Sequence, residues 1–256
     1  MRVTKNERHE LVCESVQAAG RVHVGDLATR TGVSEMTVRR DLEELEERGV
    51  LTRVHGGAIS NVSRSYEPGF AVRSLKNSDA KRRIGAAAAN LLRDGETLIL
   101  DAGTTTLEVA LALPPDRRLR VLALSLFVAD AVADLPNVTL MIPGGVVRRH
   151  ERSFIGGMTT STFANLEFDT VILTSGGIDL TAGVTEYEFD DSETKIAALR
   201  SARRIILVAD SSKLGAVAFV RLCSIEEVDV IVTDAGAPAE IVAALRARDV
   251  EVVIAT

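Results

Sequence analysis

A short stretch near the N-terminus combines a turn, a helix cap and a polar helix face. Gly32 suits a tight turn because it adopts φ > 0 without steric cost, and Ser34 suits the cap of the helix that follows. Val38, Leu42 and Leu45 then recur at helical spacing and predict one buried face. The opposite face presents a thioether, a hydroxyl and two guanidinium groups, from Met36, Thr37, Arg39 and Arg40. Such groups contact phosphates and base edges, so the stretch predicts the recognition helix of a helix-turn-helix.

The elements around this helix complete a small DNA-binding domain. Apolar spacing predicts a first helix over 5–19, ended by Gly20, and a second over 24–31. The recognition helix is predicted to end near Gly49, and a β-like run over 50–54 leads into the turn His55-Gly56-Gly57-Ala58. Three helices and a hairpin indicate a winged helix over residues 1–59. The residues predicted to bind DNA are Ser34, Met36, Thr37, Arg39, Arg40 and, in the wing, Arg53, His55 and Gly56.

Composition and charge limit the classes of protein. The net charge of −6 predicts that DNA binding depends on a local basic face, and residues 61–83 are indeed rich in lysine and arginine. No apolar run is long enough for a membrane span and no signal peptide is recognisable, so we expect a cytoplasmic protein without membrane contact. Cys13 and Cys223 match no metal spacing. We predict two reduced thiols, no metal site and no cofactor.

The rest of the chain changes character twice. Residues 60–80 lose periodicity and predict a linker. From residue 81 to 256, strand-like apolar runs alternate with helical stretches. The runs are 97–102, 121–124, 138–142, 170–174, 205–209, 228–233 and 250–254, and the helical stretches lie near 81–93, 104–113, 125–134, 156–166, 191–203 and 237–248. Continuous apolar runs are typical of strands covered on both faces, so we predict a larger, mainly parallel α/β domain.

Polar, glycine-rich loops follow several of these strands, where ligands bind in parallel α/β sheets. The segment Asp101-Ala102-Gly103-Thr104-Thr105-Thr106 closes a strand and opens a helix, so its amides and hydroxyls suit an anion. Similar loops are Gly144-Gly145 with Arg148 and Ser153, then 175–179 with Asp179, and 209–213 with Asp210 and Lys213, while Lys195 lies on a helix. Carboxylates for hydroxyls and cations for a phosphate suit a sugar phosphate. Each loop alone is weak evidence, since glycine pairs at strand ends are usually ordinary turns, and Asp101 alone is equally typical of a helix cap.

Together these motifs resemble the DeoR family of bacterial transcription regulators. The resemblance is carried by Leu27-Ala28, Gly32-Val33-Ser34, Thr37-Val38-Arg39-Arg40-Asp41-Leu42, Arg53 and His55-Gly56-Gly57-Ala58 in the first domain, and by Asp101-Ala102-Gly103-Thr104-Thr105, Gly144-Gly145, Ser153-Phe154, Gly177-Ile178-Asp179, Lys195 and Asp210-Ser211-Ser212-Lys213 in the second. It implies a winged-helix head and a sensor domain that resembles ribose-5-phosphate isomerase. It also implies a repressor of a carbohydrate operon, released from operator DNA by a phosphorylated sugar.

The chain departs from the family at one point that bears on the ligand. The family usually has Thr-Asn-Ser after the second sensor strand, whereas this chain has Ala123-Leu124-Ser125. The expected effector-binding residues are Asp101, Gly103, Thr104, Thr105, Thr106, Ser125, Gly144, Gly145, Arg148, Ser153, Asp179, Glu186, Lys195, Asp210 and Lys213.

We predict a homo-oligomer, a dimer or tetramer, that binds double-stranded operator DNA and is not an enzyme. Two alternatives stay open. One is a sugar-phosphate isomerase with an appended head, for which Asp101, Asp179 and Glu186 are candidate bases. The other is a regulator with a decayed or atypical pocket, or one that activates.

Overall fold

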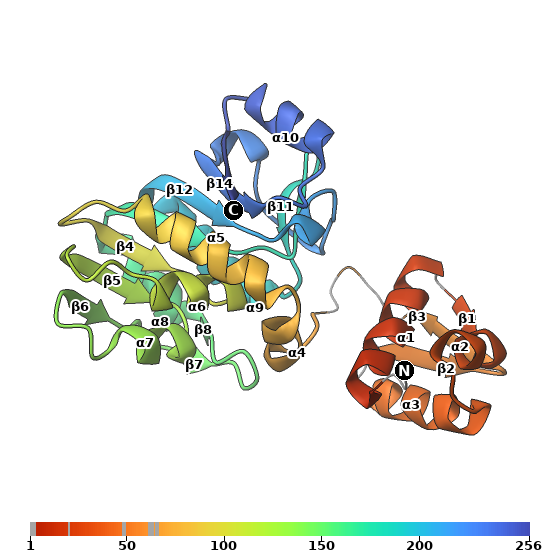
Figure 1. Ribbon diagram of the computed structural model, residues 1–256. Helices are drawn as coiled ribbons and strands as arrows, with labels where there is room; N and C mark the ends of the chain where they lie inside the picture. Colours follow the sequence, from red (N-terminus) through yellow and green to blue (C-terminus); the bar gives the residue numbers. More distant parts are fainter. Residues whose placement is uncertain (1–3, 20, 48–49, 61–63, 65–66) are drawn as a thin grey trace. The chain divides into compact units, whose positions relative to one another are not determined.

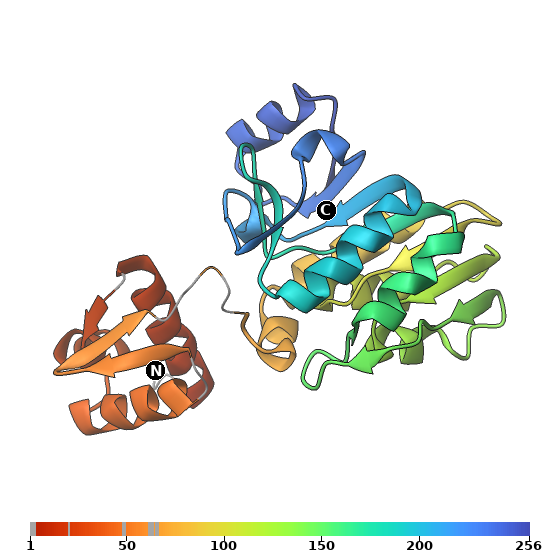
Figure 2. The ribbon, with the colours of Figure 1, turned by 180° about the vertical axis from the view of Figure 1, so that it is seen from behind.

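The computed structural model describes residues 4–19, 21–47, 50–60, 64 and 67–256. The chain divides into two compact units, residues 1–66 and 67–256, and each is described by itself (Figures 1 and 2). The predicted helix ends at Gly20 and Gly49 lie outside the described residues. Within the described ranges, no helix combines the length and apolar character needed to cross a membrane.

The first unit contains the predicted three helices and hairpin. Its elements are α1 (Lys5–Ala19), β1 (Arg21–His23), α2 (Val24–Thr31), α3 (Glu35–Glu47), β2 (Leu51–Val54) and β3 (Gly57–Ser60). The strands form an antiparallel sheet in the order β1-β3-β2, so β1 adds a strand that the sequence pattern did not predict. Gly32 is left-handed with φ 68°, and its amide donates to the carbonyl of Ala28. The turn before α3 therefore forms as predicted.

A buried ion pair joins α1 to α3. The carboxylate of Asp41 is buried and accepts from the Arg8 guanidinium, while His9 Nε2 lies 3.1 Å from Asp41 Oδ1. Burial alone would raise the pKa of Asp41, but the hydrogen bonds from Arg8 and His9 outweigh it and lower that pKa. The apolar face of α3 packs beside this pair through Val38, Leu42 and Leu45, as its spacing predicted.

The second unit alternates strands and helices. Its first half contains α4 (Phe70–Leu75), α5 (Ser78–Asn90), β4 (Thr97–Leu100), α6 (Thr104–Leu111), β5 (Leu119–Ala123), α7 (Leu126–Val132), β6 (Val138–Met141), β7 (Val146–Val147), β8 (Phe154–Ile155), α8 (Gly157–Ser161) and η1 (Thr162–Asn165). Its second half contains β9 (Phe168–Leu173), β10 (Gly177–Asp179), β11 (Gly183–Glu186), α9 (Phe189–Arg200), β12 (Ala202–Val208), η2 (Ser211–Lys213), β13 (Val220–Cys223), η3 (Ile225–Glu227), β14 (Val230–Asp234), α10 (Ala239–Arg246) and β15 (Glu251–Ala255).

Over residues 67–256, seven strands form one sheet in the order β15-β14-β12-β9-β4-β5-β6, and all neighbours are parallel. The sheet matches the predicted apolar runs. Successive residues of β4 alternate between two cores, since Leu98 and Leu100 pack with α5 and α6, whereas Ile99 packs with residues of α9. Figure 1 shows α5 and α6 on one face of the sheet, and Figure 2 shows α9 on the other. Coverage on both faces explains the continuous apolar runs.

The chain reverses its direction of travel through the sheet between β4 and β9. It runs from β4 through β5 to β6 at one edge, then returns to β9 on the other side of β4 and continues through β12, β14 and β15. The crossovers on either side of this point leave in opposite directions, so a crevice opens at the carboxyl ends of β4 and β9. Asp101 follows β4, and Thr174 and Ser175 follow β9, so these residues meet at the switch point.

Two sequence interpretations differ from the structure. Residues 67–80, expected in the linker, belong to the second unit and include α4 and the start of α5. Helix α4 has no buried residue and therefore no apolar face that sequence spacing would reveal. Ion pairs and the stacking of Phe70 on Phe127, with ring centroids 4.2 Å apart, attach α4 to the rest of the second unit. The second difference concerns 177–179, expected as a loop, which form β10 of a small antiparallel sheet with β11 and β13.

Candidate functional site

The exposed face of α3 carries the residues predicted to contact bases. Met36 is 74% exposed, and the Arg40 side chain is 82% exposed with its Nε 4.0 Å from Glu44. The Arg39 side chain is 56% exposed and donates to Glu35 Oε2 at 2.8 Å. Arg40 is therefore less constrained by a protein carboxylate than Arg39.

Ser34 and Thr37 hold the N-terminus of α3. Ser34 Oγ accepts from the amide of Thr37 at 3.3 Å and lies 3.0 Å from Thr37 Oγ1. Ser34 thus caps the helix as predicted, and its hydroxyl already has two partners. Ser34 directly precedes α3, and Thr37 lies in its first turn with the exposed Met36.

The wing is tied to α3 through Arg53. The guanidinium of Arg53 pairs with Glu43, and its amide donates to Glu46 Oε1 at 2.7 Å. His55 and Gly56 are exposed at the tip, and Gly56 has φ 79°. The next residue, Gly57, admits no side chain because a Cβ there would lie 1.9 Å from the carbonyl oxygen of Val22. A DNA contact from Arg53 would exchange the Glu43 carboxylate for a phosphate.

A polar cavity lies at the switch point of the parallel sheet. It is lined by Glu67, Arg73, Ala102, Arg148, Glu151, Ser153, Thr174, Ser175, Glu186, Asp191 and Lys195. Its volume is about 20 Å³, enough for about one water molecule. A larger ligand therefore requires a lining group to move.

Lys195 forms the floor of this cavity. Its ammonium lies 2.8 Å from Asp101 Oδ2 and 2.6 Å from Glu186 Oε2, and it donates to the carbonyl oxygen of Thr174. Asp101 Oδ2 also accepts from the amide and hydroxyl of Thr174 at 2.9 and 2.8 Å. Burial alone would lower the pKa of Lys195, but the two carboxylates outweigh burial and raise it.

A second layer of charge closes the cavity mouth. Glu67 lies 2.9 Å from the Arg73 guanidinium and 2.6 Å from that of Arg148, and Arg148 also lies 2.7 Å from Asp191. Arg73 also pairs with Glu151. Burial raises the pKa of Asp191 to about 6 although Arg148 opposes the shift, and burial likewise raises the pKa of Glu151. Two carboxyl groups in the mouth are thus able to take up protons more readily than exposed ones.

Several buried polar atoms around this cavity have no hydrogen-bond partner among the described residues. They are Ser175 Oγ, Arg73 Nε and Arg148 Nε. Unsatisfied buried donors are costly in a folded protein, and their gathering around one cavity is typical of a site that binds a polar ligand.

The structure gathers part of the predicted effector set in this cavity. Arg148, Ser153, Glu186 and Lys195 line it, Asp101 pairs with Lys195, and 103–106 begin α6 directly after the lining residue Ala102. Gly103 is needed there because a Cβ would lie 2.5 Å from Thr174 Oγ1. Thr104, Thr105 and Thr106 are buried in the first turn of α6.

Other predicted effector residues have structural partners elsewhere. The Ser125 hydroxyl accepts from the amide of Val128 and caps α7, and the Asp179 carboxylate accepts from the amides of Thr181 and Ala182 in the β10–β11 turn. Gly144 and Gly145 lie against Thr159, outside the cavity lining.

Asp210 and Lys213 also lie outside that lining. Asp210 accepts from Asn77 and Ser212, and Lys213 Nζ donates to the Tyr187 hydroxyl at 3.2 Å. Leu124, the departure from the family pattern, packs in the core with Ile99.

Sequence reasoning missed several groups that the structure brings to this end of the sheet. Asp191 lies one helical turn before Lys195, a spacing that places both on one face of α9 and would have identified it. Glu67 and Arg73 were missed because they lie in the stretch that the sequence predicted to be a linker. Lys81 is 5% exposed, its ammonium donates to the carbonyl oxygen of Arg73, and burial lowers its pKa to about 8. The helical spacing of Lys81 to the buried Ile84 and Ala88 places it on the buried face of α5, and this spacing separates it from the exposed Arg82.

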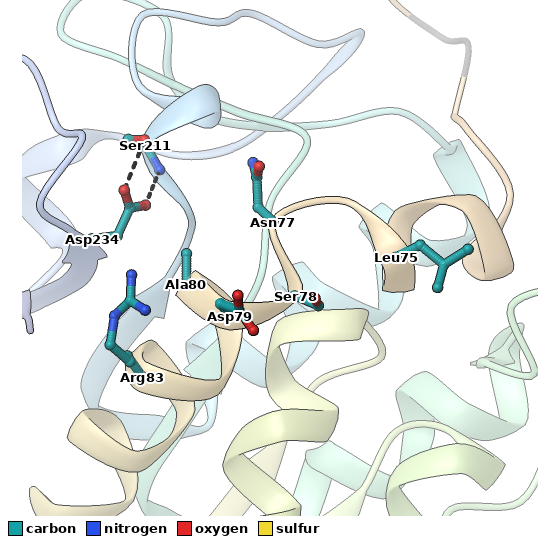
Figure 3. A pocket seen from close by; sticks show the side chains of 8 residues that line it. All are labelled: Leu75, Asn77, Ser78, Asp79, Ala80, Arg83, Ser211 and Asp234. Atoms are coloured by element: carbon teal, nitrogen blue, oxygen red, sulfur yellow. Dashed lines mark hydrogen bonds between the residues drawn. The ribbon is translucent and has the colours of Figure 1, made fainter. Parts of the chain in front are cut away.

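A shallower hollow of about 390 Å³ lies beside the start of α5 (Figure 3). Its lining includes Asn77, Arg83, Ser211 and Asp234. Asp234 already accepts from the amide and hydroxyl of Ser211 at 2.7 and 3.0 Å, which the dashed lines mark. The switch-point cavity, with its unpartnered donors, is therefore the better candidate for a ligand. Among the described residues, no group of three metal-ligating side chains is placed to hold an ion.

Two protein-family models match the chain. Residues 8–64 match a DeoR-like helix-turn-helix domain, and residues 76–235 match a DeoR C terminal sensor domain. Together the matched ranges cover both units and most of the chain.

Relatives align over nearly the full length. The transcriptional repressor CsqR of Escherichia coli is 31% identical, with 98% of this chain and 96% of the relative covered. The glycerol-3-phosphate regulon repressor of Escherichia coli is 33% identical, with 94% and 95% covered. Among solved structures, ribose 5-phosphate isomerase A from Methanocaldococcus jannaschii has 15% identity and a TM-score of 0.41, with 54% of this chain and 55% of that chain covered.

Proposed function

This chain belongs to the DeoR family of transcriptional regulators, and we propose that it represses a carbohydrate catabolic operon and is released from the operator by a phosphorylated sugar. The relatives named as repressors include one of a glycerol-3-phosphate regulon, which supports a small phosphorylated effector.

The observation that carries the DNA-binding part is the polar, exposed face of α3. Met36, Arg39 and Arg40 project from a helix whose other face is buried, so this face is available to a major groove. We assign base contacts to Arg40, Arg39 and Met36, with Ser34 and Thr37 at the backbone. Arg53, His55 and Gly56 contact the neighbouring backbone or minor groove from the wing.

The effector part is supported by the cavity at the switch point. Carboxylates such as Glu186 and Asp191 can accept hydrogen bonds from the hydroxyl groups of a polyol, and Arg73, Arg148 and Lys195 supply cations for its phosphate. Leu124 packs in the core and is not one of the residues that line the cavity.

The charge arrangement favours a binding site over an isomerase. Isomerisation needs a carboxylate free to remove a proton. Asp101 and Glu186 are both paired with Lys195, and the Asp179 carboxylate is occupied by two backbone amides. We therefore assign the sheet domain a sensing role in a cytoplasmic homo-oligomer, a dimer or tetramer, whose paired heads bind repeated half-sites.

The test is fluorescence anisotropy of the full chain on DNA from upstream of its own coding region, at two salt concentrations, against a matched scrambled duplex. We expect preferential binding that one member of a panel of sugar phosphates abolishes. Binding no stronger than to the scrambled duplex would contradict the operator assignment. Turnover of any pentose or hexose phosphate would contradict the non-catalytic role.

A further inference from the structure

Glu67 bridges two arginines at the mouth of the switch-point cavity. Its Oε1 lies 2.9 Å from Arg73 and its Oε2 lies 2.6 Å from Arg148, and its side chain is 11% exposed. Two guanidinium groups that converge on one carboxylate also form an arrangement suited to a phosphate.

The two arginines retain donors that Glu67 does not use. Among the described residues, Arg73 Nε and Arg148 Nε are buried without hydrogen-bond partners, and Ser153, which bonds Asp191, lies beside them in the lining. A carboxylate offers two oxygens, whereas a phosphate monoester offers three terminal oxygens to such donors. The donor set therefore exceeds what Glu67 satisfies.

Glu67 is also part of the weakly held start of the second unit. It is the first residue of that unit, and α4 follows three residues later. Helix α4 buries no residue, and Val72 and Leu75 are 50% and 72% exposed. Its attachments include the ion pairs of Glu67 and Arg73, the bond from Lys81 to Arg73, the stacking of Phe70 on Phe127 and contacts with α6. A segment held by few apolar contacts opens at low free-energy cost.

We propose that Glu67 is an internal anion occupying the phosphate subsite formed by Arg73, Arg148 and Ser153, and that the effector's phosphate displaces it and releases residues 67–75. The inference rests on the proposed function for the identity of the ligand, but not for the anion site itself. Displacement explains how a cavity of about 20 Å³ admits a larger ligand, since Glu67 is one of its walls.

The same exchange links ligand binding to the head. The released segment is the part of the second unit that continues directly into residues 1–66. A ligand that binds only when this segment has moved shifts the equilibrium toward the moved state. Asp191 and Glu151, which face the same arginines, take up protons as the phosphate enters and limit the charge repulsion.

The first test uses inorganic phosphate as the probe and isothermal titration of the full chain at pH 7. We expect Glu67→Gln to bind phosphate about tenfold or more tightly than the wild type, because a like charge is removed from beside the anion. The control Glu251→Gln, which changes an exposed residue at the start of β15, should leave phosphate affinity unchanged. Adding Arg148→Lys to Glu67→Gln should abolish the gain in phosphate affinity, since lysine cannot form a bidentate contact with phosphate.

Equal phosphate affinity in the wild type, Glu67→Gln and Glu67→Ala would overturn the proposal, provided that circular dichroism and melting show all three folded. The second readout is hydrogen exchange of the amides of 67–76, compared with α9 peptides. We expect faster exchange in 67–76 both for Glu67→Gln and for the wild type with phosphate. Unchanged exchange in both cases would also overturn it.

The outcomes separate the two proposals. If no sugar phosphate affects operator binding but Glu67→Gln binds phosphate tightly, the proposed effector fails while the anion site stands. If the same concentration of a sugar phosphate releases the wild type and the Arg148→Lys variant from the operator, the proposed function stands and the displacement of Glu67 is wrong.

Discussion

The ammonium of Lys195 on α9 lies 2.8 Å from the carboxylate of Asp101, at the carboxyl end of β4. Both side chains are almost fully buried, and Glu186 completes the cluster from the end of β11. One cation thus compensates two buried carboxylates at the point where the chain reverses through the sheet. Because buried charges are tolerated only in compensated groups, this cluster determines both the stability of the cavity and the groups available to a ligand.

Replacing the cation should destabilise the second unit strongly. Lys195→Met leaves Asp101 and Glu186 buried without a counter-charge, and we expect a loss of about 3–5 kcal/mol in the free energy of unfolding. Urea unfolding followed by circular dichroism measures it. The control Lys213→Met removes a half-buried lysine outside the cluster and should cost far less. Similar losses for both variants would contradict the role of Lys195.

Arg40 should contribute most to sequence discrimination. Its guanidinium is largely exposed, and an arginine bidentate to guanine discriminates by about 1–3 kcal/mol, so Arg40→Ala should lower the ratio of specific to nonspecific affinity accordingly. Anisotropy on operator and scrambled duplexes gives that ratio. Arg82→Ala, which removes an exposed arginine of α5, is the matched control. An unchanged ratio for Arg40→Ala would exclude Arg40 from base readout.

The ion pair of Asp41 should make the first unit sensitive to acid. Because the folded pKa of Asp41 is lowered, its contribution is present above the unfolded pKa of about 3.9 and is lost as pH falls through the folded pKa. At pH 7, Asp41→Asn should cost about 3–5 kcal/mol, since Arg8 is left without its carboxylate. The difference from the wild type should shrink toward pH 3. A constant difference across this range, measured by denaturant unfolding with Glu47→Gln as control, would contradict the assignment.

Lys81 should make the stability of the second unit rise with pH in the alkaline range. Burial lowers its pKa to about 8, so the penalty of burying the charged form is complete below pH 8 and disappears as pH rises toward the unfolded pKa of about 10.4. The stability of the wild type relative to Lys81→Met should therefore rise by up to about 3 kcal/mol between pH 7 and 10.5. Unfolding at several pH values measures it, with exposed Lys76→Met as the control. If the free energies of unfolding of the wild type and Lys81→Met change with pH in parallel, the role assigned to Lys81 is wrong.

The sequence by itself determined the elements whose signals are local. Apolar runs without alternation predicted the seven strands of the parallel sheet, because both faces of such a sheet are covered. Gly32, Ser34 and the spacing of Val38 predicted the turn, cap and buried face of α3, because each depends on neighbours within a few residues.

Only the tertiary structure decided which charges meet. The pair of Lys195 with Asp101 depends on β4 lying next to β9 in the sheet, and no spacing along the chain encodes that order. Helix α4 escaped prediction because ion pairs and one aromatic stack hold it, with no buried apolar face, so the bridge of Glu67 between Arg73 and Arg148 was not predicted either. Side-chain pairing across distant segments is a property of the assembled fold, since its energy arises only when burial removes the charges from water.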